Sequence, residues 1–269
     1  MSGIFRRVMT AAVLLAVFVP ALFWAPPNVW AVLISVVIAV AAHEWARLSR
    51  FTAAVSAFYA ALMGVITLAL RTLPDGDTAL LYYSLLGMAA LFWILIAPLW
   101  LSLRWRAQGP FIRAAVGVVI LLPTWAAFMY LRERGPWVML AVLAVVWVAD
   151  TAAFFAGRRF GRHKLAPRIS PGKTREGVVG AMLALVMYAS AVSAAVVGLR
   201  IVGALVLTMA LLYFSVLGDL FESWIKRVAD MKDSGSLLPG HGGVLDRIDA
   251  LTAALPIAAG VLLLAEQYS

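Results

Sequence analysis

The feature that most constrains this chain is a series of long apolar runs with almost no charge. Nine of them approach or reach the roughly 20 residues that a helix needs to cross a bilayer. They cover residues 8–25, 29–47, 52–70, 79–101, 111–131, 136–157, 177–198, 201–218 and 248–265. Only helices or a closed barrel satisfy their backbone groups in lipid, and the absence of alternation excludes the barrel. We therefore predict an all-α, polytopic integral membrane protein with about nine transmembrane helices.

The composition supports this class and excludes several kinds of site. Of 269 residues, 64% are hydrophobic and 13% are charged, whereas a soluble domain has roughly 45–50% apolar and 25% charged residues. Cysteine is absent, so disulfides, zinc–thiolate sites and cysteine nucleophiles are excluded. Three scattered histidines are too few for a histidine-based metal cluster.

The distribution of Lys and Arg predicts the orientation. With the N-terminus inside, 18 of the 22 basic residues fall on inside segments and 4 fall outside. Cytoplasmic loops of membrane proteins are enriched in these residues. We therefore predict a cytoplasmic N-terminus in the cell inner (plasma) membrane. The net charge of +9 is then explained by the Lys and Arg residues of these cytoplasmic loops. We therefore expect the lipid bilayer, and no nucleic acid, as a partner.

Two segments, 158–176 and 219–247, are longer and more polar than the other connections. Both lie on the cytoplasmic side in this orientation, so we predict that the active site is there. We predict a single membrane domain over residues 1–269, with N-terminal helices in 1–135. Catalytic helices and cytoplasmic polar loops are expected in 136–269.

The second of these segments begins with helical spacing. Asp219, Glu222, Ser223 and Lys226 lie at i, i+3, i+4 and i+7, so they share one helix face. The span that ends at 218 is therefore predicted to continue into the cytoplasm with a polar face. We expect the run Pro-Gly-His-Gly-Gly at 239–243 to break that helix.

Glycines in such a run let successive N–H groups point at one anion. The neighbouring carboxylates would repel that anion unless a divalent cation lay between them, and Mg²⁺ binds through one or two carboxylates plus substrate phosphates. Asp150, Asp219 and Asp249 lie at or near membrane depth, where ionisable groups mark functional sites. These residues together indicate metal-assisted phosphoryl-type transfer at the membrane surface.

The first polar segment adds cations and, at Ser-Pro-Gly-Lys-Thr (170–174), a predicted turn before a helix. A phosphate at the N-terminus of that helix is one interpretation. Binding of anionic lipid headgroups by a positive-inside loop is the alternative.

At this point the chain resembles the phosphatidate cytidylyltransferase (CDP-diacylglycerol synthase) family. The resemblance rests on a signature of 27 residues: Ser223-x-Ile225-Lys226-Arg227, Lys232-Asp233-x-Gly235 and Pro239-x-His241-Gly242-Gly243-Val244-x-Asp246-Arg247-Ile248-Asp249. Residues 170–174, 150–151 and 44–45 resemble further family segments. The length and the multi-span layout agree as well.

The resemblance implies a nucleotidyltransferase of phospholipid biosynthesis. Such an enzyme transfers CMP from CTP to phosphatidic acid, giving CDP-diacylglycerol and pyrophosphate, and requires Mg²⁺. An additional monovalent cation is left open. The resemblance also implies an all-helical fold in the bilayer and a homodimer.

On this interpretation the expected site residues fall into three groups. The catalytic group is Asp219, Asp246, Lys226, Arg227 and His241. The substrate-binding group is Lys173, Lys232, Arg247, Gly242, Gly243 and Ser223. The metal ligands are Asp219, Asp246, Asp249 and Asp150. We expect the last three spans to pack together, with Asp150 and Asp219 facing a wet cleft rather than lipid.

Three other classes compete with this interpretation. A transporter or channel needs polar groups through the full depth of the membrane, and the outer halves of these spans are nearly devoid of them. An intramembrane protease could pair His241 with Ser223 or Ser234, but the chain has no Gly-x-Ser-x-Gly sequence. A CTP-dependent lipid kinase would share nucleotide and metal and would phosphorylate the lipid instead of transferring CMP.

Overall fold

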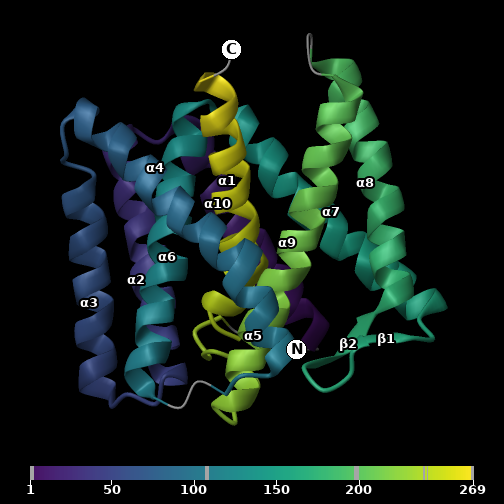
Figure 1. The fold of residues 1–269 in the computed structure, drawn as a ribbon, viewed down its shortest axis with the longest axis horizontal. Coiled ribbons are helices and arrows are strands. Elements are labelled where there is room, and N and C mark those ends of the chain that lie inside the picture. The colour runs from purple at the N-terminus through teal and green to yellow at the C-terminus, as the bar shows by residue number, and fades with distance from the viewer. Residues whose placement is uncertain (1–2, 107–108, 197–199, 239, 241, 268–269) are drawn as a thin grey trace.

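The computed structural model describes residues 3–106, 109–196, 200–238, 240 and 242–267. Helices dominate these ranges (Figure 1). In chain order the elements are α1 (Gly3–Trp24), α2 (Pro27–Leu48), α3 (Ala53–Leu70), α4 (Asp75–Leu91), the π-helix η1 (Phe92–Ile96), α5 (Ala97–Leu103), α6 (Pro110–Glu133), α7 (Pro136–Phe160), β1 (Lys164–Ala166), β2 (Ser170–Thr174), α8 (Arg175–Ala195), α9 (Ile201–Val228) and α10 (Leu245–Gln267).

The prediction of an all-α, polytopic membrane protein is confirmed. Within the described ranges, eight helical segments are long and apolar enough to cross a bilayer, and α4, η1 and α5 together supply one of them. Helix α1 overlaps the predicted first span, but its apolar stretch, Ala12–Trp24, is shorter than the other eight. The count of nine spans therefore stays a prediction.

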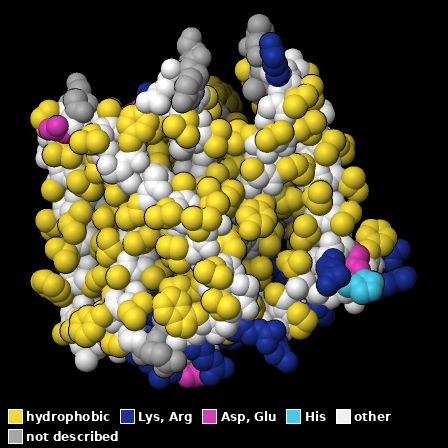
Figure 2. Space-filling model, in the orientation of Figure 1, with side chains coloured by type: hydrophobic (Ala, Val, Ile, Leu, Met, Phe, Trp, Pro, Cys, Tyr) yellow, Lys and Arg dark blue, Asp and Glu magenta, His cyan; other side chains and the backbone are white. Residues whose placement is uncertain are grey.

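The helices surround two central ones, α6 and α10, which are mostly buried, while α3 and α8 lie at opposite edges (Figure 1). Helix α2 packs on α3 and α6, α7 pairs with α8, and α9 packs between α8 and α10. The last three spans therefore pack in sequence, as predicted. On the face shown in Figure 2, an apolar band covers the middle, and Lys and Arg gather mainly at the end that carries the hairpin.

Three helices end at the polar side with a left-handed residue that is not glycine. These residues are Arg50 after α2, Arg104 after α5 and Asp230 after α9. After each one, the next N–H turns back onto its helix, as when Met231 N donates to the Lys226 carbonyl at 2.9 Å. Such a turn satisfies carbonyls that a helix end leaves unpaired. An ion pair of 2.5 Å between Arg50 and Asp230 joins the ends of α2 and α9.

This arrangement corrects one prediction. Helix α9 ends at Val228 because Asp230, at φ 59°, turns the chain away. The glycine-rich run at 239–243 was expected to break the helix, and it lies about ten residues beyond the actual end. The segment between them is a loop that returns the chain to α10.

The cation-rich segment 158–176 contains a hairpin that was not predicted. Strands β1 and β2 pair antiparallel, with Lys164 opposite Thr174 and Ala166 opposite Ser170. The residues Ser170–Thr174 are therefore extended, and the predicted turn there is wrong. Thr174 then begins α8 as its N-cap, accepting a hydrogen bond of 3.1 Å from Gly177 N. The hairpin lies beside α9 and so brings Lys173 to the polar face of that helix.

Helices α9 and α10 are in close contact at Gly218. A Cβ atom there would lie 2.7 Å from the Asp249 carbonyl oxygen and 3.2 Å from Ala253 Cβ. The first of these is a backbone atom, so a side chain at Gly218 could be accommodated only if the two helices moved apart. The absence of a side chain at Gly218 therefore sets the spacing of the two helices that carry Asp219 and Asp249.

We expect Gly218→Ala to lower the free energy of unfolding by about 1–3 kcal/mol through overpacking. The measurement is the midpoint of thermal denaturation of the purified protein in detergent. Gly203→Ala is the matched control, since it lies in the first turn of the same helix and a Cβ there meets nothing within 4 Å. Equal midpoints for the two variants would contradict the close contact between α9 and α10.

Candidate active site

The polar face predicted on α9 is present and mostly paired. Ser223 Oγ donates to Asp219 Oδ1 at 3.2 Å, and Lys226 Nζ lies 3.1 Å from Glu222 Oε1. Helix α9 has 28 residues, about 42 Å at the α-helical rise of 1.5 Å per residue. This exceeds the roughly 30 Å of a hydrocarbon core. The last turns of α9 therefore extend past the apolar region and carry these charges to the polar end.

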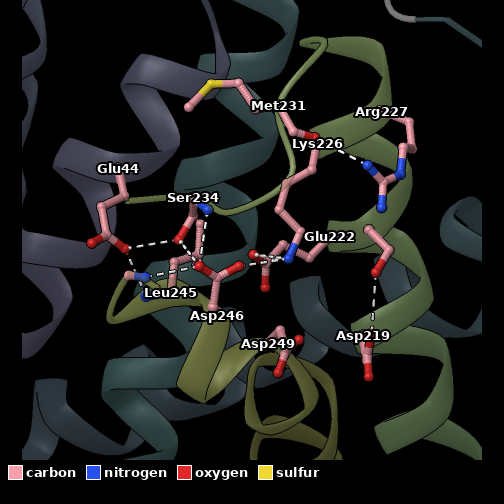
Figure 3. Close-up of polar contacts among 12 residues, drawn as sticks. Glu44, Asp219, Glu222, Lys226, Arg227, Met231, Ser234, Leu245, Asp246 and Asp249 are labelled. Carbon is pink, nitrogen blue, oxygen red and sulfur yellow. Dashed lines mark hydrogen bonds and ion pairs between the residues drawn. The ribbon is translucent and has the colours of Figure 1, made fainter. Parts of the chain in front are cut away.

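Asp246, in the first turn of α10, is buried and fully engaged (Figure 3). Its Oδ1 accepts a hydrogen bond of 2.6 Å from Lys226 Nζ. Its Oδ2 accepts from Ser234 N and Ser234 Oγ, both at 2.9 Å, and from Gly243 N at 2.8 Å. A buried carboxylate is tolerated when a cation and several donors surround it. Asp246 therefore ties α9, the following loop and α10 together.

Glu44, on α2, holds the same loop from the other side. Its side chain is buried, and within the described part of the chain it forms no ion pair. Oε1 accepts from Val244 N at 3.0 Å, and Oε2 accepts from Leu245 N at 2.8 Å. The Ser234 hydroxyl has one proton and lies 3.1 Å from Glu44 Oε2 and 2.9 Å from Asp246 Oδ2, so the two carboxylates share this donor. Leu245 begins α10, so the carboxylate also lies at the positive end of a helix dipole. We call Glu44, Ser234, Asp246 and Lys226 the carboxylate clasp.

Glycines of the loop make room for the clasp. A Cβ at Gly243 would lie 2.5 Å from Glu44 Cδ, and one at Gly235 would lie 2.9 Å from the same atom. Gly242 has φ +83°, and a Cβ there would lie 2.6 Å from Asp246 Oδ2. These three positions therefore exclude side chains because two carboxylates fill the space.

The expected cradle for a polyphosphate at this turn stays a prediction. Gly243 N, Val244 N and Leu245 N all donate to carboxylates of the chain itself. The anions at which this turn points are Asp246 and Glu44, so those three N–H groups are already satisfied. His241 lies outside the described residues.

Lys173 and Asp219 form the second ion pair of the site. Lys173 reaches from β2 to α9, and its Nζ lies 2.5 Å from Asp219 Oδ2. The two side chains are 24% and 28% exposed, so this pair is more accessible than the clasp. Asp150, on α7, interacts electrostatically with both residues and with Arg247. The structure therefore brings Asp150, Lys173 and Asp219 together from three elements.

The remaining predicted cations lie toward the surface. Arg227 donates to the carbonyls of Ile169 and Met231, each at 3.5 Å, and so links the hairpin to the end of α9. Lys232 and Arg247 are exposed at the same end of the molecule.

The charges of this region fit a bound cation. Among the described residues no three His, Cys, Asp or Glu side chains converge as a ready-made metal site. Glu222 Oε2 is nevertheless buried without a hydrogen-bond partner in that part of the chain, and Oε1 has the ion pair of 3.1 Å with Lys226. Asp249 interacts electrostatically with Asp219 and with Glu222, and Figure 3 shows Asp249 and Asp219 on neighbouring helices. Mg²⁺ needs only one or two carboxylates when substrate phosphates complete its shell, so Asp219 and Asp249 fit this role.

Three residues of this region were absent from the predicted site: Glu44, Ser234 and Glu222. Glu44 and Glu222 had a detectable signal, since each is an acidic residue inside or beside an apolar span. Ser234 had none, because a serine in a polar loop is ordinary.

Fold and site together define a multi-pass membrane protein with clustered carboxylates and lysines at the polar end of its helices. The model of the Cytidylyltransferase family matches residues 5–265. A phosphatidate cytidylyltransferase of Pseudomonas aeruginosa is 40% identical, with 96% of each chain covered. Proteins of the same name from Haemophilus influenzae and Brucella suis are 36% and 38% identical, covering 93% and 94% of this chain and 96% and 91% of their own. The chain belongs to the cytidylyltransferase family.

The clasp predicts the effect of Glu44→Gln. Glutamine keeps one acceptor oxygen and places an NH₂ group against a backbone donor, so either Val244 N or Leu245 N loses its partner. We expect this to cost about 1–3 kcal/mol. Opening of the loop should then speed amide exchange at 243–245 by about tenfold or more, measured by hydrogen–deuterium exchange mass spectrometry.

Glu266→Gln is the control for this measurement. Glu266 pairs with Arg134 at 2.5 Å on the surface, far along α10 from the clasp. Its loss should leave exchange at 243–245 unchanged. Protection in Glu44→Gln equal to that of the unaltered protein would rule out Glu44 as the residue that holds this loop.

Proposed function

We propose that this protein is a phosphatidate cytidylyltransferase, transferring CMP from CTP to phosphatidic acid and releasing pyrophosphate. The observation that carries the proposal is the accessible pair of Lys173 and Asp219 beside the carboxylate clasp. It lies where apolar helices give way to a polar end, at the depth of a lipid phosphate. The near-full-length identity to proteins of that name supports the same reaction.

The reaction joins two anions. An oxygen of the phosphatidate phosphate forms a bond to the α-phosphorus of CTP, and the bond to the β-phosphate oxygen breaks, so pyrophosphate leaves with the electron pair. Because the nucleophile is already an anion, it needs no general base. Electrostatic stabilisation of the reacting phosphates should therefore supply most of the rate enhancement.

The cations of the site would stabilise the phosphates in different ways, depending on how exposed each side chain is. Lys173 can exchange Asp219 for a phosphate oxygen because the pair is partly exposed. Arg227, Lys232 and Arg247 lie at the surface, where a triphosphate would enter. Lys226 is buried in the clasp, so its positive charge would attract the phosphates from the interior side of the site. Ser223 orients Asp219, and Gly242 and Gly243 give the loop the shape that the clasp requires.

We propose Mg²⁺ as the cofactor, with Asp219 and Asp249 as the main ligands and Asp150 and Asp246 as further candidates. Asp246 would first have to release Lys226, which now occupies its Oδ1. When bound, Mg²⁺ would neutralise charge on the triphosphate and the leaving pyrophosphate. His241 would donate a hydrogen bond to a phosphate, and an additional monovalent cation remains part of the proposal.

The proposal also includes the membrane setting. Nine spans with a cytoplasmic N-terminus would place the hairpin, the clasp and the loop on the cytoplasmic side of the inner membrane, where CTP is available. The bias of Lys and Arg toward these segments supports this orientation. A homodimer follows from the family resemblance alone.

The test uses purified protein in detergent with phosphatidic acid and CTP labelled in the cytidine ring. We expect label in the lipid fraction and release of pyrophosphate, both dependent on Mg²⁺. Label transferred only when it is placed on the γ-phosphate would instead identify a lipid kinase. No transfer of either label by folded protein would reject the proposal.

Lys173 supplies the matched variant for this assay. Loss of one preorganised donor at a developing charge typically costs about 10²–10³ in rate, so we expect Lys173→Ala to lower kcat/KM by about 10²-fold. Arg168→Ala is the control, because Arg168 is an exposed cation at the turn of the same hairpin. Equal losses in both variants would mean that only the general charge of the hairpin matters.

The orientation has its own test, which the absence of cysteine makes direct. Single cysteines would be placed at Thr72, after α3, and at Arg168, in the hairpin; both positions are exposed. With an impermeant maleimide applied to spheroplasts, we expect Thr72→Cys to react at once and Arg168→Cys only after permeabilisation. The opposite pattern would invert the proposed topology.

A further inference from the structure

A lateral groove lies between α2 and α3 and meets the carboxylate clasp only at Glu44 and the loop that follows Ser234. It has a volume of about 800 Å³ and opens at the molecular surface. Its walls are apolar and mostly small, formed by Val36, Ala39, Val40, Ala61, Gly64 and Val65. Because both helices are long and apolar enough to cross the bilayer, this part of the groove faces acyl chains rather than water.

The polar end of the groove has a different chemistry. His43 and Arg47, in the last turns of α2, line it together with Ser236 of the loop. Arg47 is exposed, and its guanidinium forms no hydrogen bond or ion pair with any residue that the structure describes. Leu237, on the same rim, exposes 61% of its surface. An apolar channel at membrane depth with a free guanidinium at its polar end matches a lipid chain joined to an anionic headgroup.

We propose that this groove binds one anionic phospholipid of the surrounding bilayer, with an acyl chain between α2 and α3 and its phosphate at Arg47. The occupant is a ligand and not the reacting lipid. This inference does not depend on the proposed reaction, since it rests on the walls and charges of the groove alone.

The separation from the candidate active site follows from the clasp. Glu44 lines the groove on one side and accepts hydrogen bonds from the loop on the other. Figure 3 shows Ser234 and Asp246 between Glu44 and the residues Lys226 and Asp219. A phosphate at Arg47 is therefore divided from Lys173 and Asp219 by the clasp and the loop.

A lipid bound in the groove would also affect the loop of the candidate active site, because that loop lines the groove. Gly235, Ser236 and Leu237 line the groove and directly follow Ser234 of the clasp. A ligand that binds only the folded arrangement stabilises it in proportion to its concentration above Kd. A lipid in the groove would therefore hold the loop in its clasped form.

Gly64 and Arg47 provide two independent variants. A Cβ at Gly64 would lie 3.5 Å from Ala39 Cβ, an ordinary contact, so Gly64→Ala should leave the groove open while Gly64→Leu fills it. Arg47→Ala removes the cation at the polar end. Arg106→Ala is its control, since Arg106 is exposed near the same end and does not line the groove.

The experiment is native mass spectrometry of detergent-purified protein with dioleoyl phosphatidylglycerol or dioleoyl phosphatidylcholine added. We expect one phosphatidylglycerol to be retained in preference to phosphatidylcholine. Gly64→Leu and Arg47→Ala should each weaken retention by about tenfold, which corresponds to about 1.4 kcal/mol. Gly64→Ala and Arg106→Ala should match the unaltered protein. Equal retention of both lipids, or of phosphatidylglycerol in all variants, would overturn the assignment.

A kinetic arm distinguishes a ligand from the reactant. In mixed micelles, the KM for phosphatidate of Gly64→Leu should stay within about twofold of that of Gly64→Ala. A rise of about tenfold or more would make the groove the path by which phosphatidate arrives, and would overturn its separation from the reaction. Absence of turnover in the unaltered protein would contradict the proposed function and leave the retention result standing.

Discussion

A buried carboxylate without a cation is the constraint on which the polar end of this molecule depends. Glu44 lies in an apolar span, where an unmatched charge would cost several kcal/mol. Its compensation comes from donors about 190–200 positions later, at Ser234, Val244 and Leu245. The loop that carries them is rich in glycine and serine. Its order therefore follows from satisfying Glu44 and Asp246, and these two carboxylates fix where α10 begins.

The glycines of this loop show where a sequence pattern stops being informative. A glycine-rich turn beside lysines predicts a phosphate cradle, because free N–H groups can converge on an anion. The N–H groups do converge, but on carboxylates of the chain. Composition cannot distinguish these cases, since a carboxylate and a phosphate make the same demand on the backbone. The partner that decides between them, Glu44, lies on a helix from the other half of the chain.

Local patterns predicted what local physics determines. Apolar runs gave the helices, and the i, i+3, i+4, i+7 spacing from Asp219 to Lys226 gave the polar face of α9 and its extension beyond the membrane. The end of α9 was missed because Asp230 adopts a left-handed conformation, which glycine adopts far more readily. The hairpin was missed because its strands have three and five residues and no apolar alternation. Both features depend on tertiary partners, Arg50 for the first and the flank of α9 for the second.

The two lysines of the site differ in a way that separates folding from chemistry. Lys226 is buried between Glu222 and Asp246, so its removal would leave two carboxylates uncompensated in the interior. Lys173 and Asp219 are partly exposed, and water can replace either partner at small cost. An arriving phosphate can therefore take Lys173 from Asp219, and the same step frees an Asp219 oxygen for a cation. Exchange at Lys226 would require the loop to open first. The accessible pair thus suits a step repeated at every turnover, while the buried pair suits a contact that keeps the loop and α10 in place throughout.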